Sequence, residues 1–289
     1  MIRFPQISLL HKDKHFLSFG NRPYARYHTL SMPDSAKKVG FLTENTFFFI
    51  TRGTKIFYFE DHHIAVDKDH FVLLKKGIYT MSEYFTEKEG FEALVIFIPD
   101  QLLKQFRYSE TFVKPVNRFD SAYSLMRPDE LLKSFRMQYM NFFGKSIANM
   151  EAILQLKLQE LFLMLCSSSN RDHLMNFIES AVPDQPADIE FIVQNHLFQP
   201  LTIAELAVLS GRSLSAFKRD FHEKYQCPPK QWINQKRLAH AHRALSYTGK
   251  TISEVAYECG FENSSHFIKI YKKQYGFTPN SVRAKNTTI

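Results

Sequence analysis

The sequence has few cysteines and no long apolar segment, and both absences restrict what the protein is. Its three cysteines, Cys166, Cys227 and Cys259, are scattered and include no Cys-x-x-Cys pair, which favours reduced thiols and a reducing compartment. No run of eighteen apolar residues occurs, and the N-terminus lacks the apolar core of a signal peptide. We therefore expect a cytoplasmic protein with no membrane partner.

Motifs for catalysis and for metal binding are also missing. There is no Gly-x-Ser-x-Gly, P-loop or dinucleotide fingerprint. His62, His63 and His70 are the histidines to weigh as metal ligands, but neighbouring residues of a strand point to opposite faces, so the rings of His62 and His63 would not converge on one ion. We expect no enzyme, no metal and no cofactor.

What the sequence does contain is an internal repeat in its last ninety residues. The first copy runs from Leu201 to Pro229 and the second from Lys250 to Pro279. Equivalent residues are 49 apart before the central glycine and 50 apart after it. One residue has therefore been gained in the turn.

Each copy has the pattern of two short helices joined by a turn. A threonine stands three residues before a glutamate, at Thr202 and again at Thr251, which is the spacing of a helix capping box. Gly211 and Gly260 then end the first helices, because glycine adopts the left-handed C-cap conformation without a clash. Two helix-turn-helix units are predicted, at about 202–224 and 251–274.

The second helix of each copy leaves small polar and basic side chains exposed when its aromatic residues pack inward. Such side chains suit phosphates and base edges. The alternative is an ordinary solvated surface, and duplication favours the first interpretation. An apolar stripe from Lys230 to Tyr247 predicts a connecting helix of roughly 27 Å, which suits two recognition helices about one DNA turn, ~34 Å, apart.

The two copies together resemble the DNA-binding domain of the AraC/XylS family of bacterial transcription regulators. The resemblance covers about residues 187–285, and its most diagnostic part is Ile252-Ser-Glu-Val-Ala-Tyr-Glu-Cys-Gly-Phe261 with Tyr-Gly-Phe-Thr-Pro279. It implies a seven-helix domain with recognition helices at about 214–224 and 264–274. The positions that read bases in the family fall here on Ser215, Lys218, Arg219, Ser264, Ser265, Ile268 and Lys269. We expect Lys272 and Lys273 to neutralise phosphates.

Charge is distributed in agreement with a polyanionic partner. Residues 187–289 hold 14 Lys and Arg against 8 Asp and Glu, whereas residues 1–186 hold 23 against 21. Most of the net charge of +8 therefore belongs to the half that contains the repeat.

The first half has the pattern of short strands. Aromatic and β-branched segments at 47–51, 55–59, 63–66, 71–74, 79–85 and 91–98 are separated by turn residues. They predict a small antiparallel barrel or sandwich, and the family resemblance implies a cupin-like regulatory domain. We expect a two-domain α+β chain: residues 1–182, with strands at about 45–98 and helices at about 99–182, and residues 187–289. Pro183 to Pro186 would form the linker.

The role of the barrel is either to bind a small effector or to dock a protein regulator. Side chains predicted to face inward and line a pocket are Phe57, Phe59, Tyr79, Met81 and Tyr84, although the same residues would also fill a core. From Asn149 to Ser168 a helix is predicted with leucines on more than one side. Leu158, Leu161 and Leu165 are candidates for a homodimer contact; the alternative is burial against the subunit's own barrel.

Together these features predict a sequence-specific transcription regulator. Its partners would be double-stranded DNA, an effector or protein regulator, a second copy of the chain and, for an activator, RNA polymerase. The alternative is an architectural DNA-binding protein with no effector.

Overall fold

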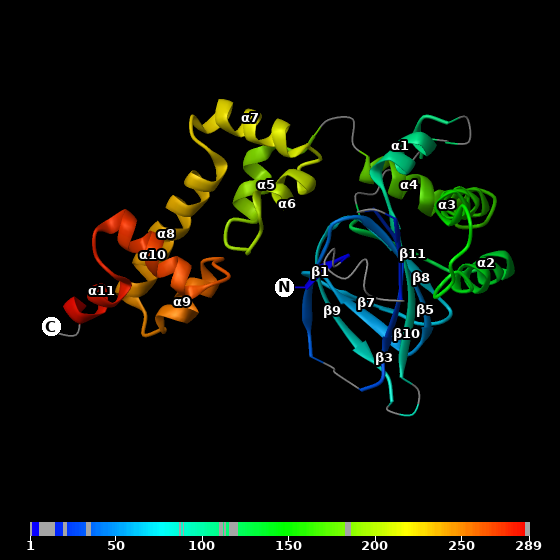
Figure 1. Ribbon diagram of the computed structural model, residues 1–289, viewed down its shortest axis with the longest axis horizontal. Helices are drawn as coiled ribbons and strands as arrows, with labels where there is room; N and C mark the ends of the chain where they lie inside the picture. Colours follow the sequence, from blue (N-terminus) through cyan, green and yellow to red (C-terminus); the bar gives the residue numbers. More distant parts are fainter. Residues whose placement is uncertain are drawn as a thin grey trace. The chain divides into compact units, whose positions relative to one another are not determined.

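The computed structural model describes residues 2–5, 15–19, 22–32, 36–86, 88, 90–109, 112, 114, 115, 121–182 and 186–286. The chain divides into two compact units, Met1–Asp184 and Gln185–Ile289, drawn in Figure 1. Of the predicted linker, residues 183–185 lie outside the described residues, and Pro186 is exposed.

The first unit is rich in strands and is followed by helices. Its elements are β1 (Ile2–Phe4), β2 (Phe16–Phe19), β3 (Arg22–Leu30), β4 (Lys38–Leu42), β5 (Asn45–Arg52), β6 (Thr54–Tyr58), β7 (His63–Val66), β8 (Phe71–Leu74), β9 (Gly77–Tyr84), β10 (Phe91–Ile98), α1 (Asp100–Arg107), β11 (Tyr123–Met126), α2 (Glu130–Met140), α3 (Met150–Cys166) and α4 (Arg171–Ala181). The six predicted strands correspond to β5–β10. Strands β1–β4 were not predicted, and β11 lies in a segment that was expected to be helical.

These strands form two sheets, which corresponds to the sandwich and not to the closed barrel, the two arrangements that the sequence predicted. The five-stranded sheet has the order β1-β4-β9-β6-β7, and the six-stranded sheet has the order β11-β8-β5-β10-β3-β2. Strand β1 pairs with β4 in parallel, in contrast to the expected all-antiparallel arrangement. The two sheets do not close into a barrel because β2 and β11, the edge strands of the six-stranded sheet, do not pair with a described strand of the five-stranded sheet.

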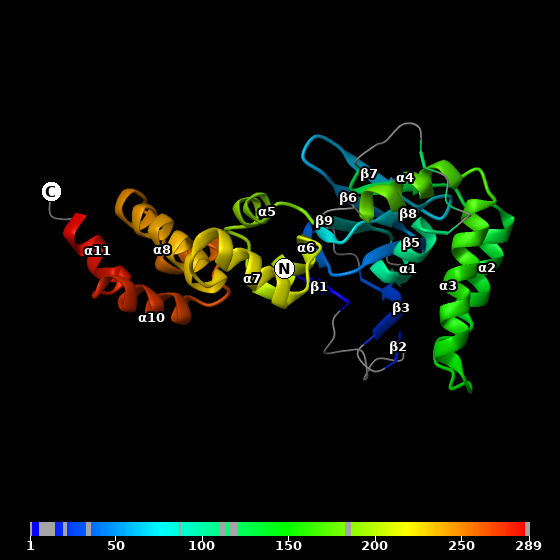
Figure 2. The same ribbon diagram turned by 90° about the horizontal axis from the view of Figure 1, so that it is seen from above.

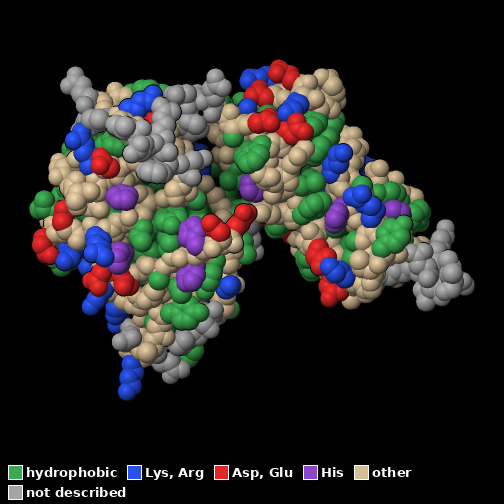
Figure 3. Space-filling model, turned by 180° about the vertical axis from the view of Figure 1, so that it is seen from behind, with side chains coloured by type: hydrophobic (Ala, Val, Ile, Leu, Met, Phe, Trp, Pro, Cys, Tyr) green, Lys and Arg blue, Asp and Glu red, His purple; other side chains and the backbone are tan. Residues whose placement is uncertain are grey.

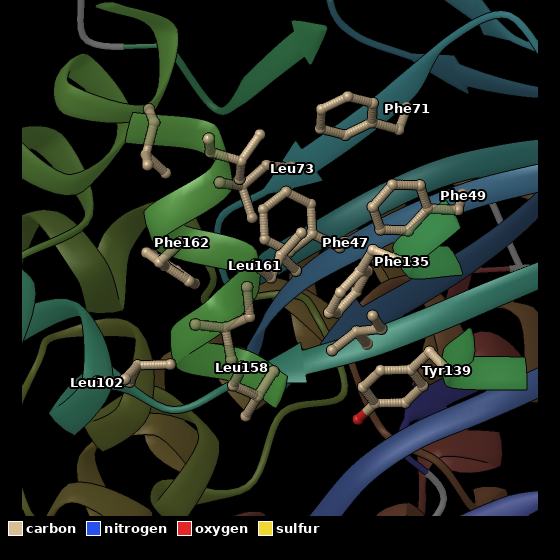
Figure 4. Packing of buried hydrophobic residues seen from close by; sticks show 14 of the residues in the cluster. Phe47, Phe49, Phe71, Leu73, Leu102, Phe135, Tyr139, Leu158, Leu161 and Phe162 are labelled. Carbon is tan, nitrogen blue, oxygen red and sulfur yellow. The ribbon is translucent and has the colours of Figure 1, made fainter. Parts of the chain in front are cut away.

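The six-stranded sheet is covered on both faces. Phe48 and Ile50 of β5 lie in a core with residues of the five-stranded sheet, whereas Phe47 and Phe49 point the other way and pack with the helices. This alternation is the ordinary period of a strand. Figure 2 shows α2 and α3 running along one side of the sheet, and Figure 4 shows the phenylalanines that meet them. The first unit therefore has three layers.

A buried ion pair lies among the apolar residues between the two sheets. Lys55 of β6 and Glu83 of β9 are cross-strand partners, and their side chains are 4% and 5% exposed. Desolvation lowers the pKa of Lys55, while Glu83 opposes that shift. The Glu83 Oε2 atom has no hydrogen-bond partner, so this pair depends on both charges being present.

The second unit is helical throughout its described part. Its elements are α5 (Ile189–Asn195), α6 (Ile203–Leu209), α7 (Leu214–Tyr225), α8 (Pro229–Tyr247), α9 (Ile252–Glu258), α10 (Ser264–Tyr275) and α11 (Pro279–Asn286). These are the seven helices that the family resemblance implies. The predicted connecting helix is α8, whose 19 residues span roughly 28 Å.

Candidate DNA-binding site

Both helix-turn-helix units begin with the predicted capping box. In α6 the Thr202 N–H donates to Glu205 Oε2 at 2.7 Å, and the Glu205 N–H donates to Thr202 Oγ1 at 3.2 Å. Thr251 and Glu254 make the same two hydrogen bonds at 2.6 and 3.2 Å before α9. Each box satisfies two N–H groups that a helix start leaves without a partner.

The turns between the helices are also built alike. Gly211 and Gly260 have φ angles of +72° and +80°. The residue after each glycine donates its N–H to a carbonyl five residues back, from Arg212 to Ala207 at 2.9 Å and from Phe261 to Ala256 at 3.0 Å. This is the Schellman arrangement, and it sets the direction in which the second helix leaves the turn.

The second helix of each unit is fixed by its cap and by an aromatic face. Ser213 Oγ accepts the Ala216 N–H before α7, and Asn263 Oδ1 accepts the N–H groups of Ser265 and His266 before α10. Each of these helices then buries two aromatic rings completely, which are Phe217 and Phe221 in α7 and Phe267 and Tyr271 in α10. The opposite faces of α7 and α10 are left open to solvent.

The nine residues predicted to contact DNA lie on these two helices. Eight are exposed, namely Ser215, Lys218, Arg219, Ser265, Ile268, Lys269, Lys272 and Lys273, and Ser264 is half-buried. After the turn, equivalent positions are 50 residues apart. Ser215 and Arg219 therefore correspond to Ser265 and Lys269, so each helix presents a hydroxyl and a cation four residues apart on one face.

The two helices differ in how the cation is held. Arg219 donates from Nε and Nη2 to Asp220 Oδ1 at 3.1 and 2.9 Å, and Arg212 donates from Nε to the other oxygen at 3.1 Å. The Arg212 guanidinium holds the pKa of the Asp220 carboxyl below its usual value, and Arg219 adds to the effect. Ile270 stands at the equivalent position of α10, so Lys269 has no such neighbour there. Sequence reasoning missed the Arg212–Asp220 pair, because it joins residues eight apart across a turn.

Two grooves border the exposed faces of α7 and α10. One, of about 540 Å³, is lined by α7 side chains, including Lys218 and His222, and by Lys230 at the start of α8. The other, of about 330 Å³, is lined by Lys230, Asn234 and His266, among others. Ile203 and Lys230 line both grooves, so the concave surface passes from α7 to the start of α10. Lys230 and His222 were not predicted as site residues.

Cationic side chains of this unit lie near histidines and apolar groups. Figure 3 shows this mixture on one face of the second unit. A surface of this kind can attract phosphate and still offer contacts to base edges.

In the first unit the five predicted pocket residues do not share one cavity wall. Phe57, Tyr79 and Met81 are buried in the core between the sheets, with Phe59 packed against it. Tyr84 is 48% exposed, so the prediction that it faces inward was wrong. It follows Glu83 on β9, and successive strand residues point to opposite faces.

A cavity of about 480 Å³ lies elsewhere in this unit. It is lined by Ser121, Tyr123, Ser124, Leu125, Asp172, His173, Asn176, Phe177 and Ser180, which belong to β11, α4 and the residues beside them. Asn176 Oδ1 is buried without a hydrogen-bond partner. No sequence pattern indicated this cavity, because β11 was not predicted.

The predicted dimer contact is wrong, because its three leucines are buried inside their own unit and cannot contact a second chain. Leu158, Leu161 and Leu165 are 2%, 0% and 0% exposed and pack with the sheet and the other helices of their own unit. Figure 4 shows Leu158 and Leu161 in this core. Leu156 and Leu163 of the same helix are 64% and 50% exposed instead. The apolar pattern identified the helix but not which of its faces the unit itself covers.

The histidines weighed as metal ligands are engaged in other contacts. His62 Nε2 lies 3.0 Å from the Tyr123 hydroxyl, and His70 Nδ1 lies 2.9 Å from Asp67 Oδ1. Across the described ranges, no three His, Cys, Asp or Glu side chains are grouped so as to hold a metal ion. No helix in that part of the chain is long and apolar enough to cross a membrane.

Comparisons with known proteins match both units. A model of the ExsA N-terminal regulatory domain matches residues 45–177, and a helix-turn-helix domain model matches residues 206–285. The chain is 25% identical over 230 residues to the virulence regulon transcriptional activator VirF of Yersinia enterocolitica, which covers 75% of this chain and 81% of VirF. It is 26% identical over 128 residues to the transcriptional regulator ExsA of Pseudomonas aeruginosa, covering 44% of this chain and 46% of ExsA. Fatty-acid-bound ToxT from Vibrio cholerae is similar with a TM-score of 0.42 and 15% identity, covering 89% and 93% of the two chains.

Two helix-turn-helix units on one connecting helix, preceded by a strand-rich regulatory domain, define a DNA-binding transcription regulator. The chain belongs to the AraC/XylS family.

Proposed function

We propose that α7 and α10 each enter a major groove and that the chain activates transcription from a bipartite DNA site in the cytoplasm. The observation that carries this proposal is the equivalence of the exposed pairs Ser215–Arg219 and Ser265–Lys269. An architectural DNA-binding protein would need basic surface but not the same hydroxyl and cation at the same positions of two helices.

The test is selection of bound fragments from random duplex DNA at one fixed salt concentration. We expect a motif with two blocks about one helical turn apart. Arg219→Ala and Lys269→Ala should each weaken the preference for one block only, by roughly 1–3 kcal/mol. Binding without any recovered motif, even with excess competitor DNA, would refute the proposal.

Lys224→Ala is the matched control. Lys224 is an exposed cation on α7, but its Nζ is held by Asp188 at 3.1 Å and Glu190 at 2.8 Å. Its removal should leave both blocks of the motif unchanged. If this control weakened one block as much as Arg219→Ala did, net charge rather than base contact would explain the effect.

For the regulatory unit, we propose a small-molecule effector in the cavity between β11 and α4. Its volume of about 480 Å³ lies within the range of ligand sites, and Asn176 Oδ1 offers a buried acceptor that has no hydrogen-bond partner among the described residues. A compound library screened by thermal shift tests this, with Asn176→Leu as the variant that should lose the response. A regulator that docks as a protein is the competing proposal, and it would leave the screen without hits.

We also propose a homodimer through the outer face of α3. Leu156 and Leu163 are exposed and seven residues apart, so they lie on one side of the helix. Leu156→Glu with Leu163→Glu should convert a dimer to a monomer in sedimentation equilibrium, whereas Leu131→Glu, at an exposed leucine of α2 outside this face, should not. A wild-type chain that is monomeric at micromolar concentration would refute this contact.

A further inference from the structure

Arg237 is a buried cation in the middle of the connecting helix. Its side chain is 7% exposed, and it donates three hydrogen bonds, all to main-chain carbonyls. Nε donates to Leu197 O at 2.7 Å, Nη2 donates to Gln199 O at 2.6 Å, and Nη1 donates to Gly260 O at 2.8 Å. Hydrogen bonds to a charged group are among the stronger ones in proteins, and the planar guanidinium can serve several acceptors at once.

These carbonyls belong to the segment that leads into the first helix-turn-helix unit and to the turn of the second. Leu197 and Gln199 lie between α5 and α6, directly before the first helix-turn-helix, whereas Gly260 forms the turn between α9 and α10 in the second helix-turn-helix. One side chain on α8 therefore joins the segment before the first helix-turn-helix to the turn of the second helix-turn-helix. We call Arg237 with residues 197–199 and Gly260 the junction.

The main chains at the junction also lie very close together. A Cβ on Gly260 would stand 2.7 Å from Phe198 O, and it would meet the Arg237 guanidinium carbon at 3.1 Å. The Phe198 ring packs on the His240 ring of α8 at 4.5 Å, which holds the segment from the other side. Gly211, the equivalent of Gly260, has nothing within 4 Å of such a Cβ. The contact therefore belongs to the joining of the two units and not to the helix-turn-helix pattern itself.

We propose that Arg237 is a positioning residue that fixes α7 and α10 relative to each other and so selects the spacing between the two blocks of the DNA site. The inference rests on the proposed bipartite reading. Arg237 is no base reader, because its guanidinium is buried on carbonyls. Its effect on DNA passes through the geometry of the two recognition helices.

DNA geometry makes this role measurable. One base pair inserted between the blocks moves the second block by about 3.4 Å along the axis and about 35° around it. A rigid pair of recognition helices cannot follow both displacements, and so it loses the contacts of one block. A pair that is free to move can follow them, but it binds the optimal site less tightly because its arrangement is no longer fixed beforehand.

The experiment measures Kd for the full chain on duplexes whose spacer is the selected length or differs from it by one base pair, at constant salt. For the wild type we expect a loss of roughly tenfold or more on either change. For Arg237→Lys, which keeps the charge but not the three-way geometry, we expect weaker binding to the optimal site and a penalty for the changed spacers of less than about threefold. Affinity for a duplex with a single block should stay the same.

Arg243→Lys is the matched control, because Arg243 is an exposed arginine on the same helix. It should keep the wild-type dependence on spacing. If Arg237→Lys kept that dependence as well, or weakened single-block binding in proportion, the positioning role would be refuted. A wild type without a bipartite motif would instead refute the proposed function, so the two failures are distinguishable.

A second variant covers the case in which Arg237→Lys does not fold. Phe198→Ala removes a ring that is 39% exposed and packs on His240, so it loosens the same segment at lower cost to the core. Labels at Glu223→Cys and Gln274→Cys, on exposed positions of α7 and α10, give a second readout without DNA. Their distance distribution should broaden in Phe198→Ala, and an unchanged distribution together with an unchanged spacing penalty would overturn the inference.

Discussion

Gly211 and Gly260 occupy equivalent turns, but replacing them with alanine should have very different costs. Both have left-handed φ angles, so alanine costs roughly 1–2 kcal/mol at either position, offset by ~0.5–1 kcal/mol from the stiffer unfolded chain. At Gly211 this is the whole effect, because a Cβ meets nothing within 4 Å. We expect Gly211→Ala to destabilise the second unit by about 1 kcal/mol.

At Gly260 a further cost arises from the junction. The new Cβ would lie 2.7 Å from Phe198 O, closer than real Cβ contacts, so the segment before α6 must move. That movement breaks at least one hydrogen bond from Arg237, worth about 1.5–3 kcal/mol for a charged donor. Added to the about 1 kcal/mol for the left-handed φ angle, this gives an expected cost of roughly 2.5–4 kcal/mol for Gly260→Ala.

Thermal unfolding separates the two values. For a unit of this size each kcal/mol shifts Tm by about 4–8 °C, so Gly211→Ala should lose about 4–8 °C and Gly260→Ala at least about 10 °C. Trp232 is the only tryptophan in the chain, and its ring lies 4.8 Å from the Tyr225 ring, so its fluorescence reports on the second unit alone. Helical circular dichroism provides the second probe.

Two results would refute the reasoning. Equal losses in the two variants would mean that the close approach at Gly260 has no energetic weight. A Gly260→Ala chain in which helicity falls while the Trp232 transition stays in place would mean that the two helix-turn-helix units unfold separately. In that case the junction would not couple them.

Three further predictions concern buried charges and the DNA face. Burial lowers the pKa of His28 to about 3 from 6.5. Between these two pH values the unfolded chain binds more protons than the folded chain, so the free energy of unfolding of the first unit falls as the pH is lowered. It should be greatest above about pH 6.5 and lower by on the order of 2 kcal/mol at pH 5. Urea unfolding should show this loss, and His28→Leu should remove it. Lys55→Met should cost roughly 3–5 kcal/mol by leaving the Glu83 charge buried, whereas adding Glu83→Leu should restore most of it in the same assay; no rescue would contradict the ion-pair argument. Lys273→Ala should weaken binding to all DNA sequences alike and lower the salt slope of binding by about one, whereas Lys269→Ala should reduce the preference for the specific sequence. Identical salt slopes in the two variants would contradict the assignment of Lys273 to phosphate and of Lys269 to a base.

The sequence by itself determined the features that depend on neighbours along the chain. The capping boxes at Thr202 and Thr251 and the Schellman turns at Gly211 and Gly260 join residues three to five apart, so their spacing alone predicted the helices. The repeat of that spacing then identified two DNA-binding units. Strands β5–β10 were predicted for a similar reason, since each is a short aromatic and β-branched segment bounded by turn residues.

Only the tertiary structure decided which faces are covered and which distant groups meet. The phenylalanines of β5 are buried on both sides, so their pattern could not assign them to one core, and the leucines of α3 did not indicate that the unit itself covers Leu158. Strand β11 exists because it pairs with β8, about fifty residues away. In the sequence Arg237 is one of four cations between residues 230 and 243. It is buried only because carbonyls 40, 38 and 23 residues away converge on its guanidinium, and separations of that size leave no local pattern to read.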